Sequence, residues 1–596
     1  MTNPASTRPD LRWVFAIWTL AAATLLWRSF GPHASGPFFA DTDDAMRMVV
    51  VRDFLAGQNW FDLVQHRLNT PFGAEIHWSR LIDLPLAALL AILTPVMGQG
   101  AALVAAGTIW PLFLLLVLLW LSAKLTLELV GPEGLLPALA LPMLSPAIMT
   151  EFTPGRVDHH GVIIVLTLAM LWASVAALRR PALAWLAGAL TATSLAIAIE
   201  ALPLAIAAIL AFGLAYIVAP ARARAMRAFG LAFGGGAALH LALIRPPSRW
   251  LETACDMLSP VYVLAALCVG AAFLLVSLLP PPRRAILRLA LLAVAGLVAT
   301  SIVAFTYPQC LGGPYAALDP WLQDNWIAQI VEAKPWFAAL ADLPGYVIAV
   351  GTPALLGTLL LLLILRRPSE DRLAWLVLLV FLVLATLVML FQVRGARLAV
   401  MPAIPAAAWL IVRARAAYLA RPRLIPALGL VASWLAFSGI ALLLIVTLVF
   451  TTFFPHPENI QNAQAARASS ALCLTADAFA DLAPLPPERI MTPIDLGAHM
   501  LLETPHEVVA APYHRNQRGI HDAFDFFNGP LDAAREIART RSLGLLVTCP
   551  AMAEMRGLAT RDPTALVDRL AADDLPDWLV DLSLPGTPLR VYAILP

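Results

Sequence analysis

Long apolar runs separated by short polar segments dominate the first three quarters of the chain. Thirteen of these runs approach the ~20 residues that an α-helix needs to cross a bilayer. They predict a polytopic α-helical membrane region over residues 1–453. The expected spans are 13–28, 101–127, 134–150, 161–178, 181–199, 201–219, 226–244, 258–279, 287–306, 345–365, 373–391, 398–412 and 424–453.

Three stretches within this region do not read as spans. Residues 28–83 and 307–344 are polar and aromatic, which predicts two large loops on the outer side. Within the first loop, Asp44–Leu55 has apolar residues at helical spacing, so we expect a helix capped by the acids that precede it. Leu84–Met97 is apolar but short and flanked by proline, which predicts an interfacial helix.

Hydrophobicity falls after residue 453, and residues 454–596 predict a separate soluble domain. Short apolar segments alternate there with helix-like stretches, a pattern typical of a small α/β fold. The expected strands are Ile490–Met491, Glu507–Ala511, Leu543–Thr548 and Leu589–Leu595, and the expected helices are Leu531–Thr540 and Ala565–Ala572.

Composition and charge agree with a membrane region followed by a soluble domain, and the charge pattern also predicts which side of the membrane each loop faces. Hydrophobic residues make up 60% of the chain, charged residues 13%, and the mean hydropathy is +0.77, which excludes a soluble globular protein. Arg8 and Arg12 precede the first span, which we expect to be an uncleaved helix with a cytoplasmic N-terminus. Arginines then fall in alternate loops, so thirteen spans place the C-terminal domain outside, in the periplasm of a bacterial inner-membrane protein.

The five cysteines include no CxxC pair and predict no zinc site of that kind. Cys473 and Cys549 share the C-terminal domain, and Cys255 and Cys310 lie in or near outer loops. A disulfide in either pair is compatible with an oxidising compartment, but the sequence alone does not decide the pairing.

Five polar islands fall on the predicted outer side, and the densest reads EFTPGRVDHHG from Glu151 to Gly161. An aspartate beside two histidines is costly in hydrocarbon unless it meets water, a metal or a charged substrate. Arg394 and Arg397 lie on the side that the positive-inside rule disfavours, which points to an anion. The other islands are DTDDAMR from Asp41, IVEAKP from Ile330, VRGAR from Val393 and PIDLG from Pro493.

These islands suggest a metal centre beside an anion site. Asp43, Asp158 and Glu332 offer carboxylate oxygens and His160 offers an imidazole. Carboxylates gathered on one surface repel one another, so a divalent cation is the natural partner. Oxygen ligands suit Mg²⁺ or Mn²⁺, and the histidine favours Mn²⁺. The metal and Arg397 would stabilise a leaving phosphate.

The order of the islands resembles the catalytic subunit of oligosaccharyltransferase, whose C-type glycosyltransferase fold has thirteen spans. DTDDAMRMVVVRDFLAG looks like the first acidic motif of that family. This resemblance implies that Asp43 is the metal-binding acid, with Asp41 and Asp44 as alternatives.

The later motifs continue the resemblance. GRVDHH looks like the second acidic motif, which implies roles for Asp158 and His160, and IVEAKP is similar to the motif that supplies a glutamate, here Glu332. VRGARLAVMPAIP resembles the stretch with the phosphate-contacting arginine, which implies Arg397, with Arg394 as the alternative.

One motif departs from the family. Its acceptor-reading WWDYG is TPIDLG in this chain, which keeps Asp495 and Gly497 and lacks both tryptophans. The loop PYHRN, which contains His514, Arg515 and Asn516, is therefore a separate candidate for substrate recognition.

The sequence thus favours a glycosyltransferase that moves a sugar or oligosaccharide from a polyprenyl-phosphate or polyprenyl-pyrophosphate donor to a glycan, lipid or protein acceptor outside the membrane. A flippase for lipid-linked sugars is the main alternative, and it predicts charged residues within spans and repeated halves. Glu200 is the one residue that approaches this pattern. No nucleotide-binding glycine loop or nucleic-acid partner is indicated.

Overall fold

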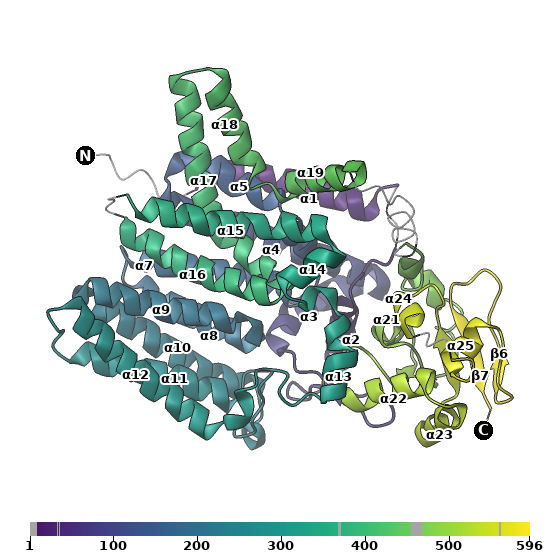
Figure 1. Cartoon of the computed structure of the whole chain (residues 1–596). Coiled ribbons are helices and arrows are strands. Elements are labelled where there is room, and N and C mark those ends of the chain that lie inside the picture. Colours follow the sequence, from purple (N-terminus) through teal and green to yellow (C-terminus); the bar gives the residue numbers. More distant parts are fainter. Residues whose placement is uncertain are drawn as a thin grey trace.

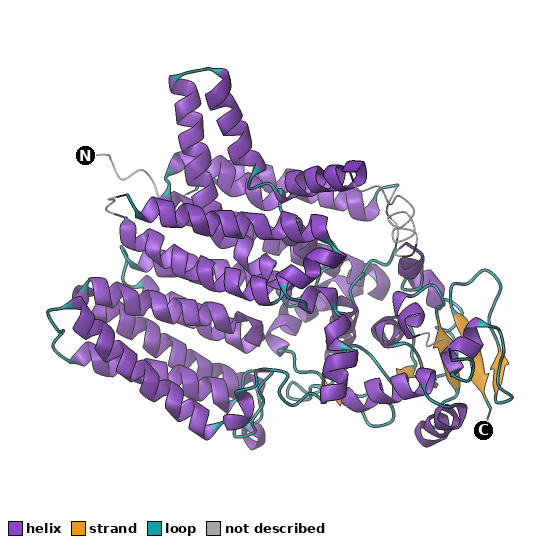
Figure 2. Ribbon diagram, viewed as in Figure 1, coloured by secondary structure: helices purple, strands orange, loops and turns teal. Residues whose placement is uncertain are grey.

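A bundle of long apolar helices forms most of the molecule, and a smaller domain with a β-sheet lies at one end of it (Figures 1 and 2). The computed structural model describes residues 9–595 except 33, 35, 368–370, 454–465, 467 and 559–561. The expected domain boundary at 453/454 borders one of these gaps, and Arg8 lies outside the described residues.

The described residues include eleven helices that are long and apolar enough to cross a membrane, or thirteen if each of two bent pairs is counted as one span. The chain is therefore a multi-pass membrane protein. The long helices are α1 (Leu11–Phe30), α3 (Arg80–Met97), α4 (Gln99–Leu129), α7 (His160–Ala177), α9 (Leu202–Val218), α10 (Ala223–Ile244), α11 (Pro260–Leu278), α12 (Ala285–Thr306), α15 (Pro344–Leu365), α16 (Arg372–Phe391) and α17 (Ala396–Ala420).

Three details differ from the sequence expectation. The stretch expected as an interfacial helix belongs to α3, which begins at Arg80 and is itself long enough to span. The expected span at 181–199 forms α8 (Leu183–Ile197), a shorter apolar helix. The spans expected at 134–150 and 424–453 are each broken, with bends of 68° and 96°. The broken pieces include α5 (Leu135–Met143), α6 (Pro146–Met149), α18 (Leu424–Leu435) and α19 (Gly439–Phe453).

Short helices fill the loops at the end of the bundle that faces the C-terminal domain. The acidic segment forms α2 (Thr42–Leu55), with Asp41 as its N-cap, as the sequence predicts. The loop before α15 contains α13 (Pro320–Asn325), the 3₁₀ turn η8 (Val331–Ala333) and α14 (Trp336–Asp342). Figure 1 shows α2 and α13 between the bundle and the C-terminal domain.

The C-terminal domain has the expected α/β character. Its five strands have the order β4-β3-β5-β7-β6, with β3 parallel to β4 and β5, and β7 antiparallel to β5 and β6. The strands are β3 (Arg489–Met491), β4 (Glu507–Val508), β5 (Leu545–Thr548), β6 (Leu579–Asp581) and β7 (Arg590–Ile594), and the helices are α21 (Ile494–Glu503), α22 (Gln517–Asn528), α23 (Leu531–Arg541), α24 (Ala553–Leu558) and α25 (Leu566–Ala571).

Both cysteine pairs considered from the sequence form disulfides. Cys255 joins Cys310 with a Cα–Cα distance of 5.3 Å, and Cys473 joins Cys549 at 6.2 Å, both in the normal range. The first bond connects the loop after α10 to the loop before α13. The second lies within the C-terminal domain.

The first outer loop attaches the C-terminal domain to the helices. Arg67 donates hydrogen bonds to the carbonyl oxygens of Leu501 (3.0 Å), Thr504 (3.0 Å) and His506 (3.3 Å). The backbone of the same loop pairs with Val508, which extends the edge of the sheet by one bridge. Backbone pairing and a charged donor together fix the domain against the bundle.

We predict that Arg67→Met loosens this attachment. The substitution removes a charged donor from three carbonyl oxygens, and hydrogen bonds to charged groups contribute about 1.5–3 kcal/mol each before relaxation. Limited proteolysis should cut the variant faster between the two parts of the molecule, with a lower melting temperature. Arg535→Met, at an exposed position of α23, is the control. Equal proteolysis of both variants would reject this role for Arg67.

Candidate active site

A cavity of about 1380 Å³ lies where the loops of the helical bundle meet the C-terminal domain. Its wall combines the start of α2, the segment before α3, the starts of α7 and α17, and the first turn of α21. Residues far apart in the sequence therefore face one space. The polar islands identified from the sequence converge at this cavity.

One guanidinium group holds the acidic part of the site together. The Nη1 atom of Arg156 lies 2.7 Å from Asp41 and 3.0 Å from Asp44, and its Nη2 atom lies 3.1 Å from Glu151 and 2.6 Å from Asp158. Asp44 and Asp158 are buried. A single positive charge thus bridges four carboxyl groups from three segments.

The local backbone explains how this cluster forms. Asp44 Oδ1 accepts hydrogen bonds from the backbone N–H groups of Val157 (2.7 Å) and Asp158 (2.9 Å), which fixes the loop to α2. Gly155 has φ +97° and packs against the backbone carbonyl of Phe38, where a side chain would collide. The glycine in GRVDHH is therefore required by the turn.

A second charged group surrounds Arg397, which is 7% exposed. Its Nη1 atom lies 3.2 Å from Glu151, and its Nη2 atom lies 3.7 Å from Glu200. Arg394 Nη1 is 3.7 Å from the other oxygen of Glu200. Arg397 Nη2 is buried and has no hydrogen-bond partner among the described residues, so it retains a free N–H for an anion.

His160 connects the two charged groups at the start of α7. Its Nε2 atom lies 3.9 Å from Asp158, and its Nδ1 atom lies 3.8 Å from Glu200. Within the part of the chain that the structure describes, the Nδ1 atoms of both His159 and His160 are buried without a hydrogen bond. These lone pairs or N–H groups remain available to a ligand.

Carboxyl groups outnumber guanidinium groups in this part of the described structure. Burial, reinforced by Asp41 and Asp158, raises the pKa of Asp43 well above its ordinary value. Burial would also raise the pKa of Asp158, but Arg156 outweighs it and lowers that pKa. Additional positive charge would relieve the repulsion. The seven acids are Asp41, Asp43, Asp44, Glu151, Asp158, Glu200 and Glu332, and the three arginines are Arg156, Arg394 and Arg397.

The comparisons with known proteins support the same reading of the fold. No protein-family model matches the sequence, and no curated protein matches it. A solved structure of the archaeal oligosaccharyltransferase AglB from Archaeoglobus fulgidus, in complex with an inhibitory peptide and a dolichol-phosphate, matches with TM-score 0.68 and 14% identity, covering 97% of this chain and 74% of that one. The chain has the C-type glycosyltransferase fold.

Two other structures of the Archaeoglobus fulgidus oligosaccharyltransferase are also similar. One, tethered with an acceptor peptide containing the NVT sequon, has TM-score 0.65 and 15% identity over 98% of this chain and 75% of that chain. Another, a complex with zinc and sulfate, has TM-score 0.54 and 14% identity over 89% and 68%. At this identity the likeness establishes the fold alone.

Within the C-type glycosyltransferase fold, most residues selected from the sequence face the cavity. Asp158 lies just behind the wall at 2% exposure. Arg515 pairs with neighbouring acids, and Asn516 is buried and donates to the Val509 carbonyl, so these two hold the loop. The lining residues from the prediction are Asp43, His160, Glu332, Arg394, Arg397, Asp495 and His514.

The site fits a divalent cation in its donor atoms. One oxygen each from Asp41, Asp44 and Asp158 lies within 4.8 Å of the others, and one atom each from His159, His160 and Glu200 forms a second such group. Asp44 Oδ2 is buried without a hydrogen bond among the described residues, and it lies beside Arg156. Oxygen-rich donors with one imidazole suit Mn²⁺ or Mg²⁺. Asp43 belongs to neither close group. Asp41 and Asp44, the alternatives to Asp43 in the sequence analysis, are therefore the acids of this segment that are placed to bind a metal.

Several residues of the site carry no role in the sequence analysis. Glu151 and Arg156 lie in the polar stretch that marks the site, but nothing in their spacing indicates that they pair with each other. Glu200 is a single charge at the start of an apolar run. Glu554 reaches the cavity from α24, and its carboxylate accepts the backbone N–H groups of Ile494 (2.7 Å) and Asp495 (2.8 Å). A carboxylate at the start of α21 is favoured by the helix dipole.

The Glu554 carboxyl group predicts a specific pH dependence of stability. Burial, together with the charge of Asp495, raises the pKa of Glu554 to about 8. The unfolded chain releases this proton near pH 4.3, so the folded state binds more protons between these values and loses stability as pH rises. Glutamine does not titrate. The melting temperature of Glu554→Gln minus that of the wild type should therefore increase from pH 5 to pH 8.

The matched control for this measurement is Glu536→Gln at an exposed position of α23. Its melting temperature should follow that of the wild type at every pH. A constant difference between Glu554→Gln and the wild type across this range would contradict the raised pKa.

Proposed function

We propose that this protein is a membrane glycosyltransferase that transfers a sugar or oligosaccharide from a polyprenyl-phosphate or polyprenyl-pyrophosphate donor to an acceptor at the extracytoplasmic face. The buried Arg397, whose Nη2 atom has no hydrogen-bond partner among the described residues, carries this proposal, in a cavity also lined by Asp43 and His160. A buried cation with a free donor suits the phosphate of a donor substrate. The similar structures with dolichol-phosphate and acceptor peptide support the same class of substrates.

In the proposed reaction, the bond between the anomeric carbon and the phosphate oxygen breaks as the acceptor atom bonds to that carbon. Arg397, assisted by Arg394, holds the phosphate and stabilises its developing charge. Asp43, a carboxyl group on the cavity wall, takes the proton of the acceptor. The phosphate-bearing lipid leaves with the electron pair.

A divalent cation would be held by Asp158 together with Asp41 and Asp44, whose oxygens lie within 4.8 Å of one another, with His160 beside Asp158. When bound, it would act as a Lewis acid toward the phosphate. We propose Mn²⁺ or Mg²⁺ as this ion. Arg156 would keep the surrounding carboxyl groups in place, because it contacts Asp158 directly.

The acceptor is a glycan, lipid or protein that enters beside the C-terminal domain. Asp495 and His514 line that side of the cavity. The tryptophans that would read an asparagine sequon are absent from TPIDLG. Incubation of the purified protein with labelled lipid-linked sugars, in manganese or in chelator, tests the reaction and its metal requirement. Release of labelled polyprenyl phosphate without any glycosylated product would contradict transfer.

We predict that Arg397→Lys loses a hundredfold or more of the turnover while the protein stays folded. Lysine keeps the charge but lacks the planar fork that contacts phosphate at two points. Loss of one such contact in the transition state costs about 2.7–4 kcal/mol. The measurement is turnover together with melting temperature. Arg415→Lys, at an exposed position of the same helix, is the control, and full activity in Arg397→Lys would remove this arginine from the mechanism.

The basic loops indicate how the protein is oriented. Helices α7 and α9 start at the cavity and run away from it, so Arg179 and Arg222 lie at the opposite end of the bundle, where Arg222 donates to the Leu178 carbonyl at 2.6 Å. The positive-inside rule places such arginines in the cytoplasm. We therefore propose an inner-membrane protein with a cytoplasmic N-terminus and a periplasmic C-terminal domain.

This orientation predicts which cysteines a membrane-impermeant maleimide labels in spheroplasts. In a Cys268→Ser background, the remaining cysteines form disulfides. Arg535→Cys in the C-terminal domain should react, and Arg283→Cys in the loop between α11 and α12 should react only after lysis. The reverse labelling pattern would reject the proposed orientation.

A further inference from the structure

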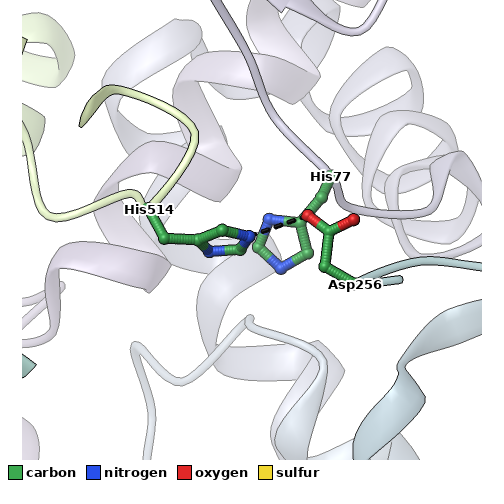
Figure 3. A group of neighbouring side chains, drawn as sticks. All are labelled: His77, Asp256 and His514. Atoms are coloured by element: carbon green, nitrogen blue, oxygen red, sulfur yellow. Dashed lines mark hydrogen bonds and ion pairs between the residues drawn. The ribbon is translucent and has the colours of Figure 1, made fainter. Parts of the chain in front are cut away.

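A second group of metal-ligating side chains lies on the cavity wall, separate from the acids around Arg156. His77, Asp256 and His514 each contribute one ligand atom, and these atoms lie within 4.8 Å of one another. Figure 3 shows both imidazole rings and the carboxylate converging from three different segments. His514 Nε2 is 2.7 Å from Asp256 Oδ2, and the two rings are 4.5 Å apart between centroids.

The segments that carry these residues belong to different parts of the fold. His77 follows β2 (Ala74–Glu75) in the first outer loop, Asp256 lies between α10 and α11, and His514 lies before α22 in the C-terminal domain. No local turn brings them together. Their convergence therefore depends on the docking of the C-terminal domain.

His77 is ready to act as a ligand. No hydrogen bond joins its ring to any residue that the structure describes, although the ring contacts those of Trp78 and His514. Burial, with a further contribution from His514, holds the pKa of His77 well below its ordinary value. A neutral imidazole has a lone pair on one ring nitrogen, which is the form that binds metals.

Asp256 is oriented by a positively charged neighbour. Arg515 donates to both carboxylate oxygens at 2.7 Å, and its Nη1 atom lies 2.6 Å from Glu75. Burial would raise the pKa of Asp256, but the hydrogen bonds from Arg515 and His514 outweigh it, so the carboxyl group stays ionised. Glu75 offsets the charge of Arg515, which leaves Asp256 able to neutralise a cation.

The surroundings hold this geometry in place. The disulfide of Cys255 fixes the residue next to Asp256 to the loop before α13. Arg249 joins Glu75 at 2.7 Å, and the Tyr315 ring packs edge-on against His514 at 5.3 Å. Partners that orient ligands in this way are a general feature of metal sites.

We propose that His77, Asp256 and His514 bind a zinc ion that clamps the C-terminal domain to the membrane-embedded part of the protein. Two imidazoles and one carboxylate form a zinc donor set, and a fourth position would face the cavity. Binding replaces the hydrogen bond between His514 and Asp256, because the Nε2 lone pair of a neutral His514 then points to zinc while the ring proton lies on Nδ1. This site goes beyond the proposed glycosyl transfer and differs from the acidic cluster in its nitrogen-rich ligands.

Metal analysis of the full-length protein tests the proposal without any sugar donor. After chelation and titration with zinc, we expect His77→Ala and His514→Gln each to lose one bound equivalent that the wild type retains. Asp43→Asn, in the acidic cluster, should keep this equivalent. His66→Ala is the matched control, because His66 is exposed in the same outer loop and pairs with Asp62. Cobalt substitution should give visible absorption in the proteins that keep the site.

Two further measurements use affinity and stability. Arg515→Gln should weaken zinc binding about 10- to 100-fold, because Asp256 loses its orienting partner. Zinc should raise the melting temperature of the wild type and of His66→Ala, and it should not raise that of the His77 and His514 variants. Full zinc stoichiometry and an unchanged zinc-dependent melting shift in both histidine variants would overturn the proposal. Loss of the equivalent in Asp43→Asn alone would assign the metal to the acidic cluster and would also overturn it.

Discussion

The guanidinium group of Arg156 lies among four carboxyl groups that come from the start of α2, the 3₁₀ turn Thr150–Phe152 and the loop before α7. Buried acids at this density repel one another unless cations lie between them. Arg156 supplies part of this positive charge. Glu151 forms ion pairs with both Arg156 and Arg397 and so links the two arginines. The positions of α2, α7 and α17 around the cavity therefore depend on one shared charge, and the remaining excess of acid makes the cavity attractive to divalent cations.

Apolar run length predicted the membrane bundle well, because a helix that crosses a bilayer must be continuously apolar. Run length contains no information on helix direction, so the bends between α5 and α6 and between α18 and α19 were not predictable from it. In the C-terminal domain, Leu545–Thr548 was recognised because it is buried throughout. Leu579–Asp581 was missed because it is a short edge strand with two exposed residues, which gives no periodic signal.

Some residues of the site were also predictable from the sequence, and others were not. Those within compact motifs, such as Asp158 and His160, were predictable because several polar residues in an apolar context stand out together. Glu200 was recognised as unusual but not as a partner of Arg397, since 197 residues separate them in the sequence. His77 and Asp256 gave no signal, because each is a single polar residue in a polar loop. Pairing across the fold is a property of tertiary structure.

The size of the cavity has a consequence for the order of events. Pockets for a single small ligand typically measure about 300–1,000 Å³, and this one, at about 1380 Å³, exceeds that range. It is bounded on one side by Arg397 of α17 with Arg394 just before that helix, and on another by the C-terminal domain. Under the proposed function, a space of this size would hold donor and acceptor side by side, and transfer would pass through a ternary complex. Steady-state velocities would then follow intersecting rather than parallel double-reciprocal lines.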